Sequence, residues 1–266
     1  MRKFIYIIFV SILMLTCVEP YDFEVVSAGQ VLIIDASLTN ETKAHRVKLS
    51  TSYDLDQSIE KPVTGASIWV EDENKTRTEY YESAPGEYYT EASFSGNVGS
   101  SYVLSITTTD GNNYMSTPEL LLPPSPIDSI YGRYMTLPST TTSEILSGMQ
   151  FFIDTHDSQS EFSNYRFEFE QDYEIIVPYA SLFTFSQSDL VLLPRDTSVR
   201  ACYQNIPSSG VKVTTTSGQA ENRLSEFPLI MVEEQEPYLS SRYSLRVKQF
   251  SISSKAYQYY KDLKEN

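Results

Sequence analysis

A stretch near the middle of the chain decides the fold class: residues 165–170 read Tyr165-Arg166-Phe167-Glu168-Phe169-Glu170. Aromatic and charged side chains alternate there with a period of two, which places the rings on one face of a β-strand and the charges on the other. Outward from this stretch, segments with the same period and with turn residues between them fill most of the chain. The 20 Tyr and 13 Phe also favour strands. We therefore expect a mainly β protein.

Short strand patterns follow one another over residues 30–122. The clearest is a hairpin at residues 76–94, with Ala84-Pro85-Gly86 as its turn. Asp110-Gly111 predicts a second hairpin, because both residues tolerate the positive φ of a tight type I′ turn. The regular spacing of the turns is typical of sandwiches. Residues 30–122 are thus predicted to form an immunoglobulin-like or carboxypeptidase-regulatory-like β-sandwich.

Residues 123–127 predict a linker, because Pro123, Pro124 and Pro126 cannot pair within a central strand. Residues 128–266 then predict a second β-rich domain. Its expected strands lie at about residues 127–134, 149–155, 165–176, 199–204, 211–216, 228–233 and 242–252.

The last strand and the end of the chain carry two further signals. Phe250 and Ile252 fall out of phase with the apolar residues before them, and a β-bulge near Lys248-Gln249 would return them to the core. The apolar period then changes to that of a helix after Ser253-Ser254, which can cap a helix, and we expect this helix from about Ser254 to Lys264.

The N-terminus has the layout of a secretory signal peptide. Arg2 and Lys3 precede an apolar run over residues 4–15, which as a helix would rise roughly 18 Å against a hydrocarbon core of about 30 Å. Cys17 follows directly, and this arrangement resembles the bacterial lipobox, in which the Cys is lipidated. We expect residues 1–16 to be a signal peptide and residues 17–29 a lipidated tether. The alternative is an ordinary signal peptide in which Cys17 is incidental.

Net charge, the acidic residues after Cys17 and the number of cysteines restrict the expected partners and the expected cellular location. The formal net charge of −15 makes nucleic-acid binding improbable. Glu19, Asp22 and Glu24 resemble the surface-export signal of Bacteroidota lipoproteins, which favours the outer face of the outer membrane. A lipidated Cys17 leaves Cys202 without a disulfide partner, and we expect Cys202 to be a buried small apolar residue.

Several short motifs, in order, resemble a Bacteroidota lipoprotein family catalogued as domain of unknown function 4249. They are Thr16-Cys17 and residues 62–68 (PVTGASI), 85–89 (PGEYY), 101–106 (SYVLSI), 122–130 (LPPSPIDSI), 242–250 (RYSLRVKQF) and 256–260 (AYQYY). The resemblance implies a cell-envelope lipoprotein encoded near TonB-dependent outer-membrane transporters. Members usually continue past the helix with more strand material, so the second domain is expected to be truncated at its C-terminus. The family supplies no catalytic or binding residues.

The residues that could carry chemistry are few. His45 and His156 are the only imidazoles, and neither has the spaced partners of a zinc site. Asp154, Asp157 and Glu161 surround His156 but lack the order of a calcium loop, so a solvated acidic loop is favoured over a metal site. No Gly-x-Ser-x-Gly elbow occurs. We expect no enzymatic activity, no metal and no cofactor.

Paired tyrosines are the candidate partner surface. Tyr80-Tyr81 and Tyr88-Tyr89 place at least one ring of each pair on the less buried face of a regular strand. The same holds for Tyr259-Tyr260 at the C-terminal helix. For any single Tyr, an ordinary place at the edge of a core is the commoner explanation.

The leading hypothesis is therefore a non-enzymatic outer-membrane lipoprotein, exposed at the cell surface, that acts as an accessory or binding protein beside a TonB-dependent transporter. The alternative is a surface lipoprotein that binds glycans or peptides without a transporter. A hydrolase ranks third.

Overall fold

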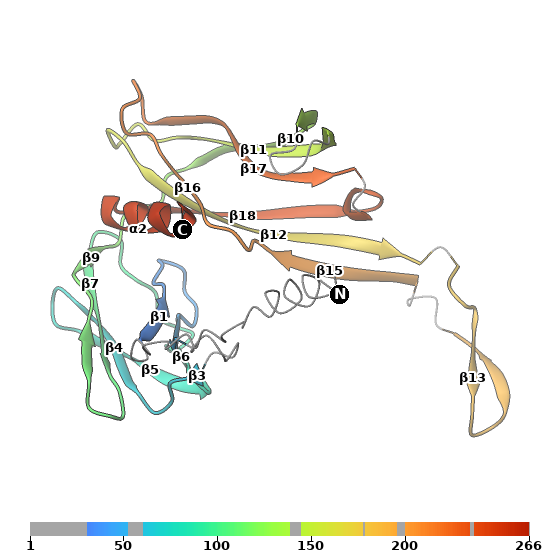
Figure 1. Cartoon of the computed structure of the whole chain (residues 1–266), viewed down its shortest axis with the longest axis horizontal. Helices are drawn as coiled ribbons and strands as arrows, with labels where there is room; N and C mark the ends of the chain where they lie inside the picture. Colours follow the sequence, from blue (N-terminus) through green and yellow to red (C-terminus); the bar gives the residue numbers. More distant parts are fainter. Residues whose placement is uncertain are drawn as a thin grey trace, which may run out of the picture.

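The computed structural model describes residues 31–52, 61–138, 145–177, 179–195, 200–234 and 237–265. These residues form a mainly β protein with two groups of strands and, near the C-terminal end, the helix α2 (Ser254–Glu265) (Figure 1). The expected signal peptide, the tether and Cys17 lie outside the described residues. Among the helices that are described, none has the length and apolarity needed to span a bilayer.

The N-terminal domain is one antiparallel sheet bent over its own inner face. Its path of hydrogen-bonded strands runs β1-β2-β6-β5-β4-β7-β8, with β3 beside β2 and β9 beside β7. The strands are β1 (Leu32–Ala36), β2 (Arg46–Thr51), β3 (Lys61–Pro62), β4 (Ser67–Asp72), β5 (Arg77–Ala84), β6 (Glu87–Tyr89), β7 (Ser101–Thr107), β8 (Asn113–Met115) and β9 (Glu119–Leu120).

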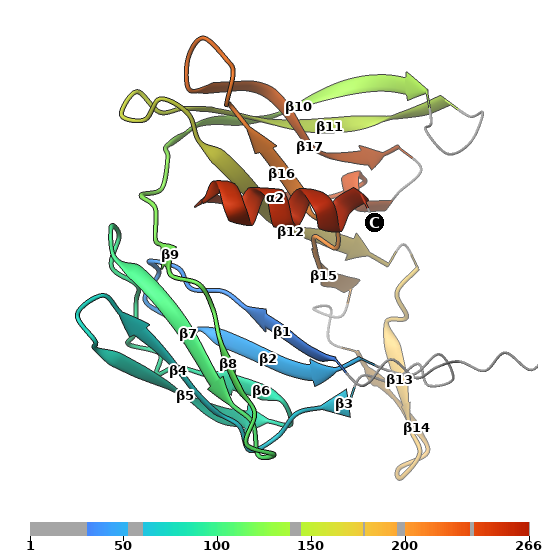
Figure 2. The ribbon, with the colours of Figure 1, turned by 60° about the vertical axis from the view of Figure 1, so that its left-hand side comes forward.

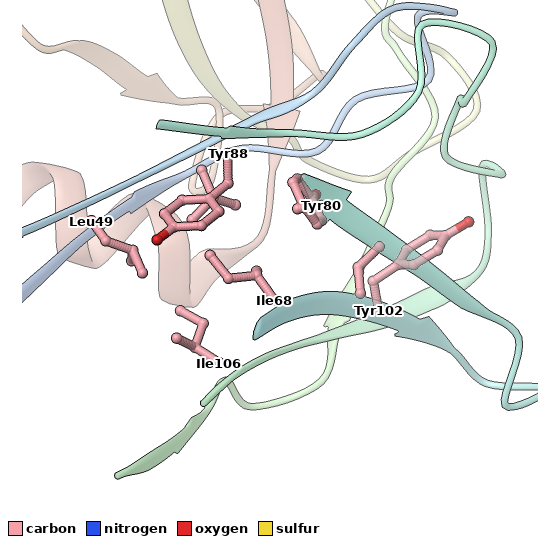
Figure 3. Packing of buried hydrophobic residues seen from close by; sticks show 8 residues of the cluster. Leu49, Ile68, Tyr80, Tyr88, Tyr102 and Ile106 are labelled. Atoms are coloured by element: carbon pink, nitrogen blue, oxygen red, sulfur yellow. The ribbon is translucent and has the colours of Figure 1, made fainter. Parts of the chain in front are cut away.

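The hydrophobic core of the N-terminal domain contains side chains from distant strands of this sheet, which shows that the sheet folds back on itself. Leu49 of β2 and Ile106 of β7 lie far apart in the strand order, yet both belong to the same buried cluster. Figure 3 shows their side chains converging with Ile68, Tyr80 and Tyr88. A flat sheet could not bring these side chains together, so the strands enclose the core from two sides, as in a sandwich.

The C-terminal domain has two larger sheets and one separate hairpin. The first sheet has the order β10-β11-β17, and the second has the order β15-β12-β16 with β18 also on β12. Within the described ranges, β13 pairs only with β14. The strands are β10 (Ile127–Pro138), β11 (Ile145–His156), β12 (Asn164–Ile176), β13 (Phe183–Ser186), β14 (Val191–Pro194), β15 (Ala201–Pro207), β16 (Lys212–Thr215), β17 (Arg223–Glu233) and β18 (Tyr243–Ile252).

The alternating stretch at residues 165–170 forms the middle of this domain. Tyr165 and Phe167 of β12 are 0% and 1% exposed and pack against Ile153 and Leu229 of the facing sheet. Arg166 points to the other face, where its guanidinium lies 5.0 Å from the centre of the Tyr260 ring on α2. The predicted period therefore separates a core face from a face that α2 covers.

The predicted bulge near Lys248-Gln249 is wrong. The register between β12 and β18 runs without a shift from Asn164↔Ile252 to Tyr173↔Tyr243. Phe250 is out of phase because it belongs to the opposite face of β18, where the Arg166 guanidinium lies 4.6 Å from its ring centre. A strand covered on both faces does not need a bulge to bury both sets of side chains.

Two turn predictions have different outcomes. The turn at Ala84-Pro85-Gly86 is confirmed, since β5 ends at Ala84 and β6 begins at Glu87. The hairpin at Asp110-Gly111 is also confirmed, joining β7 to β8. Its predicted type I′ turn is wrong, however, because Gly111 has a φ of 85° while Asp110 is not among the residues with positive φ.

Helix α2 begins where the sequence predicts a cap. The backbone N–H of Ala256 donates to the Ser253 side-chain oxygen at 3.1 Å, which satisfies one of the free N–H groups of the first turn. Figure 2 shows α2 lying between the C-terminal sheets and the N-terminal domain. The helix therefore sits at the junction of the two domains.

Candidate functional site

The hairpin of β13 and β14 projects beyond the ends of the sheet strands β12 and β15 and lies apart from both groups of strands (Figure 1). We call residues 182–195 the projecting hairpin, and the backbone N–H of Arg195 closes its base by donating to Leu182 O at 2.8 Å. Apart from the half-buried Ser186, every residue of its two strands is exposed. An isolated two-stranded hairpin is marginally stable in water, so such a hairpin needs a special explanation.

One face of the projecting hairpin is entirely apolar. Phe183 pairs with Pro194 and Phe185 pairs with Leu192, and cross-strand partners lie on the same face of a sheet. Phe183, Phe185 and Leu192 are 51%, 58% and 66% exposed. Contiguous exposed apolar side chains mark interaction surfaces in soluble proteins. This face is the strongest candidate binding surface in the described part of the chain.

The tip of the hairpin carries a hydrogen-bonded carboxylate beside one apolar residue, Leu190, which is 74% exposed. The hydroxyls of Ser186 and Ser188 donate to the Asp189 carboxylate at 2.9 and 3.2 Å. A charged, hydrogen-bonded tip opposes insertion into a hydrocarbon layer, because the carboxylate would lose its hydration. The apolar face therefore suits the surface of a partner protein better than the interior of a bilayer.

Apolar exposure continues from the hairpin onto the end of the sheet that carries it. Ile176 at the end of β12 and Tyr203 of β15 are 57% and 66% exposed. Cys202, between Ala201 and Tyr203, is also exposed, so its predicted burial is wrong. Strands β12 and β15 extend past the core there, and none of the described strands forms a second sheet over their ends (Figure 1).

The four candidate tyrosines of the N-terminal domain do not form one surface. Tyr80 and Tyr88 are only 7% and 1% exposed and belong to the core, so their expected place on a partner surface is wrong (Figure 3). Tyr81 and Tyr89 are cross-strand neighbours on the outer face, where Tyr81 is 58% exposed. Each pair thus has one ring inside and one ring outside, as alternation requires.

The buried Tyr88 also has a structural hydrogen-bonding role. Its hydroxyl donates to Val63 O at 2.8 Å and accepts from the N–H of Ala66 at 3.0 Å. Because the hydroxyl uses both its donor and an acceptor site, the ring can be buried without an unpaired polar atom.

The first of the two histidines, His45, is buried in the N-terminal domain. His45 is 1% exposed, lies just before β2, and contacts the ring of Phe94 edge-on with centroids 5.7 Å apart. Burial, followed by the positive charge of Lys43, holds the pKa of His45 below its usual value. This environment keeps the imidazole neutral, as a structural residue requires.

Two of the three acidic residues around His156, Asp154 and Asp157, accept structural hydrogen bonds, and the third, Glu161, is exposed. Asp154 accepts from the N–H of Glu226 at 2.7 Å, and Asp157 accepts from the Ser125 hydroxyl at 3.0 Å. Over the residues described, no three His, Cys, Asp or Glu side chains gather closely enough to hold a metal ion.

Sequence reasoning did not single out the projecting hairpin. The signal was present, since Phe183, Phe185 and the run Val191-Leu192-Leu193 flank the polar turn at residues 186–189. Apolar residues are ordinarily interpreted as core, so only the structure reveals that these side chains are exposed.

Comparisons with known proteins place the chain in a family without a described function. No curated protein matches it. Among solved structures, it is similar to the crystal structure of a DUF4785 family protein from Legionella pneumophila, with 9% identity and a TM-score of 0.27. That match covers 85% of this chain and 47% of the other, so this chain spans about half of its length. The model of the family named domain of unknown function DUF4249 matches residues 18–266, and the chain belongs to that family.

Proposed function

We propose that this protein is a non-enzymatic outer-membrane lipoprotein that docks onto a TonB-dependent transporter through the projecting hairpin. The observation that carries the proposal is the apolar face of Phe183, Phe185 and Leu192, which the described residues leave uncovered. Covering this face removes apolar area from water and stabilises a hairpin that is marginal by itself.

Two features of the hairpin suit a partner that itself contains β-structure. Among the described residues, each of its strands pairs only with the other, so both outer edges present backbone N–H and C=O groups to a partner. A partner strand can add to one edge by β-augmentation while its side chains cover the apolar face. Backbone pairing would provide affinity, and pockets for Phe183 and Phe185 would provide specificity.

The expected lipid anchor at Cys17 would place this docking at the surface of the outer membrane. Several acyl chains would hold the protein stably at the outer membrane, whereas one chain gives only marginal binding. Confinement to the same membrane raises the effective concentration of the hairpin near a membrane partner. A modest affinity of the hairpin for its partner in solution would then be sufficient for docking at the membrane surface.

Site-specific photo-crosslinking in intact cells tests the proposal. The photoreactive residue p-benzoylphenylalanine replaces Phe185 in the full-length chain, and in the matched control it replaces Glu79, which is exposed on β5 of the N-terminal domain. We expect a crosslink to a TonB-dependent transporter, identified by mass spectrometry, from position 185 and not from position 79.

Three results would overturn the proposal: no transporter crosslink from position 185, an equal yield from both positions, or an undiminished yield after Cys17→Ala releases the protein from the membrane. A crosslink from position 185 only to soluble peptides would favour the alternative, a surface lipoprotein that binds peptides without a transporter.

A further inference from the structure

The junction between the two domains is incompletely filled. A pocket of about 290 Å³ lies there, lined by Leu38 and Leu121 from the N-terminal domain and by Ile252 and Ala256 from the C-terminal domain. Among the described strands, none of one domain pairs with a strand of the other. Domains with such an interface ordinarily move relative to each other. Whether these two domains move therefore depends on the segment that connects β9 to β10 (Figure 2).

The N-terminal domain holds this connecting segment as far as Leu121. Glu119 and Leu120 of β9 pair with β7. Directly after β9, the backbone N–H of Leu121 donates to Ser100 O at 3.0 Å, and Leu121 O accepts from the N–H of Gly99 at 2.8 Å. The Leu121 side chain packs against the N-terminal core. The backbone at Leu121 is thus fixed to the N-terminal domain.

The C-terminal domain holds the segment from Ser125 onward, because all three polar groups of this residue are hydrogen-bonded. Its N–H donates to Oγ of Ser251 at 3.3 Å, and its hydroxyl donates to the Asp157 carboxylate at 3.0 Å. Its carbonyl accepts from Nε2 of Gln249 at 3.0 Å. Ser125 is 7% exposed, although the residues on either side of it are exposed. We call Ser125, Asp157, Gln249 and Ser251 the Ser125 network.

A further hydrogen bond fixes the next residue. The hydroxyl of Thr155, which is 0% exposed, donates to Pro126 O. The same hydroxyl oxygen accepts from Nε2 of Gln249 at 3.2 Å, which joins Thr155 to the Ser125 network. Pulling the segment away would leave buried donors and acceptors without partners, and this is costly. The backbone at residues 125 and 126 is thus fixed to the C-terminal domain.

Three residues remain between these two attachments: Leu122, Pro123 and Pro124. The proline ring fixes φ of Pro123 and Pro124 near about −65°. A residue that precedes a proline is restricted to extended conformations, which applies to Leu122 and Pro123. Such a segment is a semi-rigid extended spacer with a rise of about 3.1 Å per residue, or roughly 9 Å for three residues. The part of the connection that is not hydrogen-bonded therefore has little freedom to bend.

We propose that residues 121–126 form a rigid linker that holds the two domains at one fixed angle. Its two ends are fixed by hydrogen bonds to opposite domains, and its middle is stiffened by two consecutive prolines. The sheets that carry the projecting hairpin consequently keep a constant position relative to the N-terminal domain. This inference does not depend on what the projecting hairpin binds.

Double electron–electron resonance, which gives the distribution of distances between two spin labels, tests the proposal. Nitroxides are attached to p-acetylphenylalanine at the exposed positions Glu79 of β5 and Ser244 of β18 in the detergent-solubilised full-length protein. This chemistry leaves both cysteines unchanged. We expect one narrow distance distribution, because the labels lie on opposite domains that do not move relative to each other.

Two variants with glycine in place of proline show whether the linker sets this width. Replacing Pro123 and Pro124 together by Gly should broaden the distribution at least about twofold, because Gly-rich segments are flexible. Pro118 is also exposed and precedes β9, but it lies within the N-terminal domain. The matched control Pro118→Gly should therefore leave the distance distribution between the domains unchanged.

A third variant tests the Ser125 network. Ser125→Ala with Gln249→Ala removes the hydrogen bonds to Asp157 and to the Ser125 carbonyl, and it should broaden the distribution less than the double glycine variant does. A second label pair within the C-terminal domain, at Thr136 of β10 and Ser244 of β18, should keep its wild-type width in this variant. Broadening between the domains then reports movement at the junction and not local unfolding.

The proposal is overturned if the wild-type distribution is broad, if the double glycine variant keeps the wild-type width, or if Pro118→Gly broadens the distribution equally. An unchanged width after loss of the Ser125 network would likewise contradict it. Since none of these measurements involves a transporter, failure here would leave the docking proposal untouched.

Discussion

Two antiparallel hairpins of this protein carry aromatic side chains in opposite surroundings. The hairpin of β5 and β6 lies inside the N-terminal sheet, with β4 on one side and β2 on the other, and its Tyr88 is 1% exposed. The hairpin of β13 and β14 pairs with no further strand in the part of the chain that the structure describes, and its Phe185 is 58% exposed. Aromatic residues in a hairpin therefore stabilise the fold only when the rest of the chain covers them.

The two hairpins consequently differ in what they contribute. Burying a large apolar side chain stabilises a folded protein by about 1.5–3 kcal/mol, and an exposed one contributes little. The β5–β6 hairpin supports the fold, whereas the projecting hairpin keeps its apolar area available for a partner. Four predictions test this contrast, from the largest expected effect to the smallest.

The largest effect is expected from Tyr88→Ala in the buried hairpin. The substitution removes a fully buried ring and its hydrogen bonds to Val63 and Ala66, and we expect it to lower the free energy of unfolding by roughly 3–5 kcal/mol. Urea denaturation followed by circular dichroism measures the change. A loss below about 1 kcal/mol would contradict the role assigned to this ring.

The turn of the buried hairpin should also be sensitive. Gly86 has a φ of 75°, and an added Cβ would lie 2.6 Å from Leu49 O and 2.8 Å from Pro62 Cβ. Gly111 has a φ of 85°, but nothing lies within 4 Å of its added Cβ. Both substitutions to Ala incur left-handed backbone strain of about 1–2 kcal/mol, and only Gly86→Ala adds a backbone clash. We expect Gly86→Ala to be clearly the more destabilising in the same denaturation assay, and equal losses would contradict the close packing at this turn.

A pH effect is expected in the N-terminal domain. Burial keeps the pKa of His45 below its ordinary value of 6.5, so the unfolded chain takes up the proton more readily than the folded one. Stability should therefore be constant above pH 6.5 and fall as the pH drops below it, by at most about 1.4 kcal/mol per pH unit for this one proton. The difference in unfolding free energy between wild type and His45→Gln, measured from pH 8 to pH 5, isolates this contribution. A difference that does not depend on pH would contradict the lowered pKa.

The smallest effect on stability is expected in the projecting hairpin. Replacing Phe183, Phe185 and Leu192 together by Ser should change the free energy of unfolding by no more than about 0.5 kcal/mol per site, because these side chains are already exposed. Hydrogen exchange should also be faster in β13 and β14 than in β5 and β6 of the wild type. A large loss of stability, or slow exchange in the projecting hairpin, would show that the body of the protein covers it.

Much of the fold could be predicted from local pattern. The alternation at residues 165–170, the turn at Pro85-Gly86 and the cap at Ser253 each lie where the sequence places them. These signals depend on the period of the side chains and on the geometry of a few backbone atoms. Residues that are neighbours in the sequence are sufficient to specify these features, so they can be predicted without knowing the tertiary contacts.

The candidate sites could be predicted only in part. The tyrosine pairs were expected to have one ring on each face, but the sequence did not state which ring is buried. That choice depends on which face of the sheet closes over the core, and the same pattern fits either face. The pocket between the domains was missed as well, because the residues that line it, such as Leu38, Leu121 and Ala256, lie far apart in the chain.

The sequence by itself determined a mainly β protein, the positions of most strands and the C-terminal helix, because alternation, turn residues and caps act over a few residues. Only the tertiary structure decided that Tyr88 is core, that Phe185 is exposed and that residues of both domains line one pocket. The physical reason is that burial is a property of the whole chain: an apolar side chain is driven from water wherever it lies, but which surface covers it depends on contacts between distant segments.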